Sequence, residues 1–120
     1  MGNLQKEKTM KYLIRMENPD VLLIQDTKLG EERFLFKIKR IWSIGIGIAL
    51  SSRGTLGGIG TIWKELVFDL VQHKVASHWI LTQLKHKATN TVVSLFNIYV
   101  HVFLSEKSNV GILSLNWLVA

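Results

Sequence analysis

The segment that most constrains the fold is residues 18–29, Asn-Pro-Asp-Val-Leu-Leu-Ile-Gln-Asp-Thr-Lys-Leu. It begins with a turn signal, continues through four large apolar residues and ends in a polar cluster. A short apolar run bounded by turn signals is typical of a strand that is buried on both faces of a sheet. The segment therefore predicts a central strand at residues 21–25, in a mixed or parallel sheet that helices cover.

Asp26 follows this strand directly, so we expect it at the carboxyl end of the strand, at the edge of the sheet. Open α/β folds place ligands and metal-binding groups at this edge. A carboxylate there is the kind of oxygen ligand that Mg²⁺ prefers, which makes Asp26 a candidate metal ligand. The structural alternative is an aspartate that closes the loop by accepting hydrogen bonds from backbone N–H groups.

Length and composition indicate one domain or a piece of one, because the chain has 120 residues, of which 48% are hydrophobic. The net charge of +6 suits a nucleic-acid partner, and it equally suits ordinary solubility. The absence of cysteine excludes disulfides, zinc–thiolate sites and thiol catalysis. The uncharged stretch at 42–52 is too short to span a bilayer, and the first residues lack the apolar core of a secretion signal. We therefore expect a nuclear or cytoplasmic protein that is not secreted and has no membrane partner.

Patterning along the chain predicts two helices and a series of strands. Residues 3–17 carry apolar side chains at helical spacing, and the Asn-Pro that follows ends this helix. Residues 31–40 have acids first and bases last, which favours a helix, although their aromatic residues alternate as in a strand. Apolar residues alternate with small ones at 44–50, which predicts a strand with one closely approached face. Further strands are expected at 58–63, 66–71, 79–84 and 91–102, with a hairpin connection at 85–90.

Residues 19–28 resemble the Pro-Asp-(apolar)-Gln-Glu-Thr-Lys element of the endonuclease/exonuclease/phosphatase superfamily, which has the DNase I-like fold. Within this superfamily, the chain resembles the plant-type endonuclease domain of non-LTR retrotransposons. Residues 2–18 are similar to the family's basic helix, 52–64 to its Ser-x-Gly…Gly-Gly-(apolar)-Trp hairpin, and 93–100 to its Asn-(apolar)-Tyr-x-Pro strand. The resemblance implies a partial DNase I-like α/β sandwich, with a mixed, largely antiparallel sheet and flanking helices, incomplete at both ends.

The resemblance also implies roles for three residues. Asp26 takes the position of the glutamate that holds the family's catalytic Mg²⁺, with an arm one methylene shorter. Asn97 and Tyr99 take positions in the family's catalytic strand, where the tyrosine lies beside the scissile phosphate; being two apart, they face the same side. The structural alternative for Tyr99 is an aromatic ring packed on the sheet with its hydroxyl at the rim.

Three further catalytic motifs of that family have no counterpart among the 120 residues: the first metal-binding Asn, an Asp-x-Asn pair and a terminal Asp-His pair. Phosphodiester hydrolysis needs a cation clamp and a base for water. We therefore expect a partial domain at residues 1–104 and a divergent tail at 105–120. We interpret the chain as a truncated fragment of a Mg²⁺-dependent endonuclease-like domain that acts on nucleic acid, DNA in particular, and that is inactive by itself.

Two other interpretations stay open: a non-catalytic basic module that binds nucleic acid or protein, and a retrotransposon remnant without a function. We also expect only one of the family's two sheets, so that an apolar sheet face stays exposed and supports self-association. The strands at 45–50 and 92–102 are the candidates for such contacts, since they are rich in β-forming residues and nearly free of charge. The four histidines show no metal-ligand spacing, and the four tryptophans are expected in the core.

Overall fold

The computed structural model describes residues 2–25, 31–50, 58–98, 102–104 and 111–116. Within these ranges the protein is α/β and mostly strands, which confirms the α/β class. Its elements in chain order are α1 (Gly2–Glu17), β1 (Val21–Gln25), α2 (Glu31–Ile41), β2 (Gly45–Leu50), β3 (Ile59–Lys64), β4 (Phe68–Val75), β5 (Trp79–His86), β6 (Val92–Ile98), β7 (Val102–Leu104) and β8 (Ile112–Asn116).

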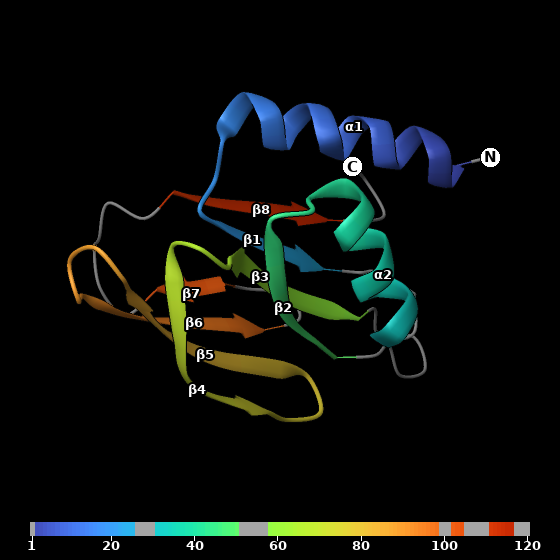
Figure 1. Ribbon diagram of the computed structural model, residues 1–120. Helices are drawn as coiled ribbons and strands as arrows, with labels where there is room; N and C mark the ends of the chain where they lie inside the picture. Colours follow the sequence, from blue (N-terminus) through green and yellow to red (C-terminus); the bar gives the residue numbers. More distant parts are fainter. Residues whose placement is uncertain (1, 26–30, 51–57, 99–101, 105–110, 117–120) are drawn as a thin grey trace.

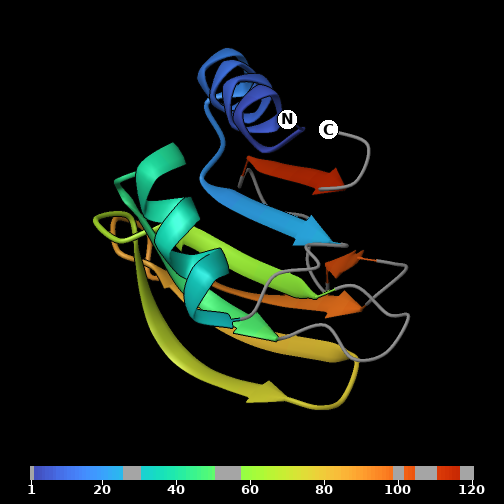
Figure 2. The same cartoon turned by 90° about the vertical axis from the view of Figure 1, so that its right-hand side faces the viewer.

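The strands build two four-stranded sheets that pack face to face (Figures 1 and 2). The first has the order β2-β3-β1-β8 and is mixed, because β8 runs parallel to β1 while the other pairs are antiparallel. Both helices lie on its outer face (Figure 2), so we call it the helix-covered sheet. The second has the order β4-β5-β6-β7 and is antiparallel; none of the described helices lies on its outer face, so we call it the open sheet.

The expectation of a single sheet was wrong, because the strands from residue 68 to 104 form a second sheet over the inner face of the first. Val21, Leu23 and Trp63 of the helix-covered sheet belong to one buried cluster with Leu84 and Leu95 of the open sheet. The apolar face that the sequence analysis expected to be exposed is therefore buried between the sheets. The face that no described helix covers is instead the outer face of the open sheet.

β1 is buried on both faces, as its apolar run predicts. Leu22 and Ile24 belong to the cluster beneath the helices, whereas Val21 and Leu23 belong to the cluster between the sheets. All four side chains are 0% exposed. Burying a residue of this size stabilises the fold by about 1.5–3 kcal/mol, so this short strand is the centre of the core.

The two helices end and pack as their sequences predict. Asn18 has φ of 46°, and its N–H donates to the Ile14 carbonyl at 2.8 Å, which ends α1 in a left-handed cap just before the proline. In α2 the buried residues are Phe34, Ile38 and Ile41, a helical spacing, while Phe36 is 67% exposed. The helical interpretation of residues 31–40 is therefore confirmed over the strand alternative.

Glycines let α2 lie directly on the backbone of the helix-covered sheet. A Cβ on Gly60 of β3 would lie 2.3 Å from the Phe34 ring, and one on Gly45 of β2 would lie 2.6 Å from the Trp42 ring. Real Cβ atoms do not approach this closely, so both positions require glycine or a shift of the neighbouring ring. The closely approached face predicted at residues 44–50 is confirmed.

Three differences concern the second half of the chain. The single strand predicted at 91–102 is wrong, because β6 ends at Ile98 and β7 begins at Val102 and pairs with β6 in the antiparallel direction. β4 begins later and runs further than predicted, at Phe68–Val75 instead of 66–71. β8 lies within 105–120, the segment predicted as a divergent tail, yet it pairs in parallel with β1. Asp20 anchors this pairing at the amino end of β1, because its N–H donates to the Gly111 carbonyl at 2.8 Å and its Oδ2 accepts from the Gly111 N–H at 3.2 Å.

Candidate functional site

A buried polar cluster lies between the two sheets, where β1 and β6 finish. Asn97 of β6 is 0% exposed, and its Nδ2 donates to the Gly60 carbonyl of β3 at 3.0 Å. The same nitrogen lies 3.3 Å from Oγ1 of Thr61, which is also fully buried. Gln25, the last residue of β1, donates from Nε2 to Asn97 Oδ1 at 3.2 Å. Polar side chains from three strands of two sheets therefore meet at one edge of the sandwich.

Strand alternation explains why these side chains meet. Gln25 follows Val21 and Leu23 at intervals of two, so it shares their face toward the open sheet. Asn97 follows Leu95 in the same way on β6. Leaving a buried amide without partners costs about 1–3 kcal/mol, so the cluster favours one register between the sheets.

The predicted metal ligand and the predicted tyrosine, Asp26 and Tyr99, both lie outside the described residues. The residues before them in sequence, Gln25 and Ile98, are hydrogen-bonded: Gln25 Nε2 donates to the Ile98 carbonyl at 2.5 Å. Thus β1 and β6 end beside each other, although Gln25 and Asn97 are 72 residues apart in sequence. The predicted catalytic role of Asn97 stays a prediction.

The described part of this site does not fit a Mg²⁺ ion. Gln25 and Asn97 contribute amides that bond to each other, and no carboxylate of the described residues joins them. Among the described residues there is no group of three or more His, Cys, Asp or Glu placed to hold a metal. Mg²⁺ in proteins is usually held by one or two carboxylates, so the described residues alone would not retain it.

The histidines and tryptophans of the described ranges do not gather into a site. His86 packs edge-on against Phe68, with ring centroids 5.5 Å apart, and His78 Nδ1 bonds to the neighbouring serine hydroxyl. Trp42 and Trp63 are 6% and 2% exposed, so both are core residues as predicted. Trp79 is only half-buried; it lies on the open sheet, where it packs edge-on against Phe96. His101 and Trp117 lie outside the described residues.

The helical layer carries most of the positive charge. Its two helices hold eight basic and four acidic residues, a net charge of +4 out of the +6 of the whole chain. Glu7 of α1 is 6% exposed and lies 3.3 Å from Lys37 Nζ and 3.7 Å from Arg40 of α2, an ion-paired link between the helices. The exposed cations of the layer are Lys8, Lys11, Arg15, Arg33, Lys39 and Arg40.

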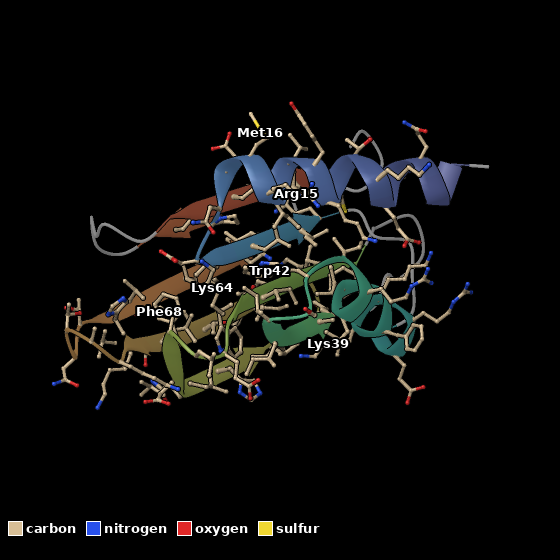
Figure 3. All side chains as sticks on the ribbon, turned by 45° about the horizontal axis from the view of Figure 1, so that its top comes forward. Arg15, Met16, Lys39, Trp42, Lys64 and Phe68 are labelled. Carbon is tan, nitrogen blue, oxygen red and sulfur yellow. The ribbon has the colours of Figure 1, made fainter. Side chains whose placement is uncertain are left out.

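A shallow hollow of about 480 Å³ lies on α2, lined by Glu32, Arg33, Phe36, Lys37 and Arg40. An exposed aromatic ring between cations can stack on a nucleic-acid base while the cations contact phosphates. The sequence pattern alone did not reveal this feature, because Phe34, Phe36 and Ile38 also alternate as on one face of a strand. Met16 of α1 likewise projects away from the sheets (Figure 3) and is 66% exposed.

A scan of known protein families finds no match, and searches of the curated proteins and of the solved structures find none either. Of the described helices, none is both long and apolar enough to cross a membrane.

Proposed function

We propose that this chain is an endonuclease-like domain of the DNase I-like class, directed to nucleic acid, and that it is catalytically inactive by itself. The proposal places Asp26 at the position of a Mg²⁺ ligand, and Asn97 and Tyr99 at catalytic-strand positions. We further propose that DNA is the partner of this chain and that the protein is nuclear or cytoplasmic.

One observation supports this proposal most: the hydrogen bond between Gln25 and Asn97 inside the sandwich. The two motifs that resemble the family's catalytic elements end at residues 28 and 100, far apart in sequence. Their strands nevertheless finish at the same edge of a two-sheet sandwich, with the side chains of Gln25 and Asn97 in contact. If the two motifs contribute to one catalytic site, their strands must end side by side in this way.

The described residues perform a structural task at this edge. Asn97 and Thr61 hold β6 against β3, and Gln25 holds the end of β1 against β6. Positioning of this kind is necessary for phosphodiester cleavage but is not sufficient for it, because the reaction also needs charge stabilisation and a base for water. The described side chains of this cluster are neutral amides and a hydroxyl.

A plasmid-nicking assay tests the proposal. Supercoiled plasmid is incubated with the protein and Mg²⁺, and we expect no relaxed product above that of a protein-free control. Nicking that disappears in Asp26→Ala but persists in Asp69→Asn, a change on the open sheet, would show that the chain is an active nuclease and that the inactive assignment is wrong.

A second candidate function is non-catalytic binding of nucleic acid through the helical layer. The net charge of +4 on the two helices and the exposed Phe36 among Arg33 and Arg40 favour it. Binding through phosphate contacts releases counterions, so the affinity falls steeply as the salt concentration rises.

A fluorescence-anisotropy titration of a labelled single-stranded oligonucleotide, with EDTA and a series of salt concentrations, tests this candidate. We expect the logarithm of the association constant to fall linearly with the logarithm of the salt concentration. Each phosphate contact that is removed should make this slope less steep by about 0.7. Lys8→Gln/Lys11→Gln removes charge from the helical layer, and Lys85→Gln/Lys87→Gln is the matched control on the open sheet. Equal effects of the two double variants would rule out the helical layer as the binding surface.

A further inference from the structure

Among the described strands, β4 lies at one edge of the open sheet. In the sheet order it has a neighbour only on the β5 side, and it forms the outer margin of the molecule in Figure 2. Seven of its eight residues are exposed, and only Phe68 is buried. Leu70, Val71 and Val75 are 42%, 52% and 45% exposed, so this edge combines unpaired backbone groups with apolar side chains. Such an edge is a template for pairing with another strand.

The register shows which backbone groups of β4 are unpaired. Lys87 N–H donates to the Val67 carbonyl at one end of the β4–β5 ladder, and Ala76 N–H donates to the Trp79 carbonyl at the other. Because hydrogen-bonded and non-hydrogen-bonded pairs alternate in an antiparallel ladder, the residues bonded toward β5 are then Asp69, Gln72 and Lys74. The residues whose N–H and C=O groups point away from β5 are Phe68, Leu70, His73 and Val75, and of these Leu70, His73 and Val75 are exposed whereas Phe68 is buried.

A β-bulge at Val71, which is skipped in the ladder, divides these free residues into two groups. Before the bulge they have even numbers and after it odd numbers. In antiparallel pairing of two copies, the free groups of one β4 strand therefore meet those of the other when an even-numbered residue is opposite an odd-numbered one. This is the case when the two-fold axis passes between Val71 and Gln72. In that register the exposed Leu70 is opposite His73, once on each side of the axis, and the buried Phe68 is opposite Val75.

The same register also places opposite charges of the two copies next to each other. It places Asp69 opposite Lys74 of the second copy, twice per dimer. Both residues bond toward β5, so they form a non-hydrogen-bonded pair at the new interface, the type in which side chains are closer together. Asp69 lies 3.8 Å from Lys87 within one copy but remains 61% exposed, so its carboxylate is accessible to a second chain.

We propose that β4 pairs with β4 of a second copy of this chain, in this two-fold register, and joins the two open sheets into one continuous sheet. A lysine and a bulge on an edge strand discourage pairing with unrelated strands. Here the bulge lies at the symmetry axis and the lysine has a complementary aspartate, so both features select a second copy. The proposal does not depend on the nuclease-like function.

Charge reversal tests the register by sedimentation velocity on the full chain at concentrations up to about 100 µM. We expect wild type to form a dimer. Asp69→Lys places lysine opposite Lys74, and Lys74→Asp places two aspartates opposite each other, so each variant weakens the dimer by at least about tenfold. The double variant Asp69→Lys/Lys74→Asp restores opposite charges and with them the dimer. A monomeric wild type, or a double variant no tighter than the single variants, overturns the proposal.

His73→Pro provides an independent test of the pairing. It removes an N–H group that points toward the second copy while leaving the bonds to β5 in place, as proline on an edge strand allows. We expect a monomer with a cooperative thermal transition by circular dichroism. A variant that stays dimeric overturns the pairing through β4, because another surface then holds the copies together. If the variant shows no thermal transition, the charge-reversal variants decide the question.

Discussion

The helix-covered sheet and the open sheet have the same number of strands but differ in how their faces are covered. In the helix-covered sheet, β1 and β3 are buried on both faces, and an ion pair centred on the buried Glu7 links the helices above them. In the open sheet, β5 alternates between buried and half-buried residues, and β4 is almost entirely exposed. The outer face of the open sheet carries a hydrogen-bonded row of Gln72, Gln83 and Ser94 across three strands.

This difference shows how a sheet face that no described helix covers is adapted to contact with solvent. The polar row crosses the middle of the open face, while the half-buried Trp79 and Phe96 pack on each other near its end. The face is therefore amphipathic rather than uniformly apolar, and the least protected part of the open sheet is its β4 edge. The same type of substitution should have different consequences in the two sheets.

The largest difference is expected for leucine truncation. Leu22→Ala in β1 removes a side chain that is 0% exposed beneath the helices and should lower the free energy of unfolding by about 2–5 kcal/mol. Leu81→Ala in β5, where the side chain is half-buried on the open face, should cost about 1 kcal/mol or less. Urea denaturation of both variants measures the difference, and equal losses would mean that the open face is covered in solution.

The polar cluster between the sheets gives the next largest effect. Asn97→Ala leaves the Gly60 carbonyl without the Asn97 amide and Gln25 with only its bond to the Ile98 carbonyl, and should cost about 2–3 kcal/mol. Thr82→Val is the matched control in the same interface, because Thr82 Oγ1 is buried without a hydrogen-bond partner among the described residues. Removing this hydroxyl should raise the free energy of unfolding by about 1 kcal/mol. A Thr82→Val variant as unstable as Asn97→Ala would contradict this account of the cluster.

Glycine substitution tests how closely α2 approaches the helix-covered sheet. Gly60→Ala forces the buried Phe34 ring to move, since the new Cβ would lie 2.3 Å from it, and should cost about 1–3 kcal/mol. At Gly111, before β8, a Cβ would meet its nearest atoms at 3.7 Å or more, an ordinary contact. Gly111→Ala should therefore leave the thermal midpoint within a few degrees of wild type, for a change well below 1 kcal/mol. Similar midpoints for the two variants would show that α2 does not press on β3.

The smallest contrast concerns ion pairs. Glu7→Gln leaves Lys37, whose side chain is 13% exposed, without its partner and should cost about 1–2 kcal/mol. Lys87→Gln breaks an ion pair with Asp69 whose side chains are 42% and 61% exposed, and should cost less than about 0.5 kcal/mol. Chemical denaturation at low and high salt distinguishes the two, because only the exposed pair is strongly screened. A large loss in Lys87→Gln would indicate that the open sheet is less exposed than the structure shows.

The sequence by itself determined both helices, most of the strands and the burial of β1. The four apolar residues at 21–24, the Asn-Pro that ends α1 and the small residues at 44–50 act through backbone conformation and side-chain size. These are properties of neighbouring residues, so they can be predicted without knowing the fold. The strands at 79–84 and 58–63 were located for the same reason.

Only the tertiary structure decided which strands share a sheet and which side chains meet. The strands after residue 68 have the alternation of a meander, and alternation does not say whether a meander extends one sheet or covers it with another. The contact of Gln25 with Asn97, the parallel pairing of β8 with β1 and the exposure of Phe36 each depend on residues distant in sequence. Burial of apolar surface between layers selects such contacts, and this free energy belongs to the packed molecule rather than to any one segment.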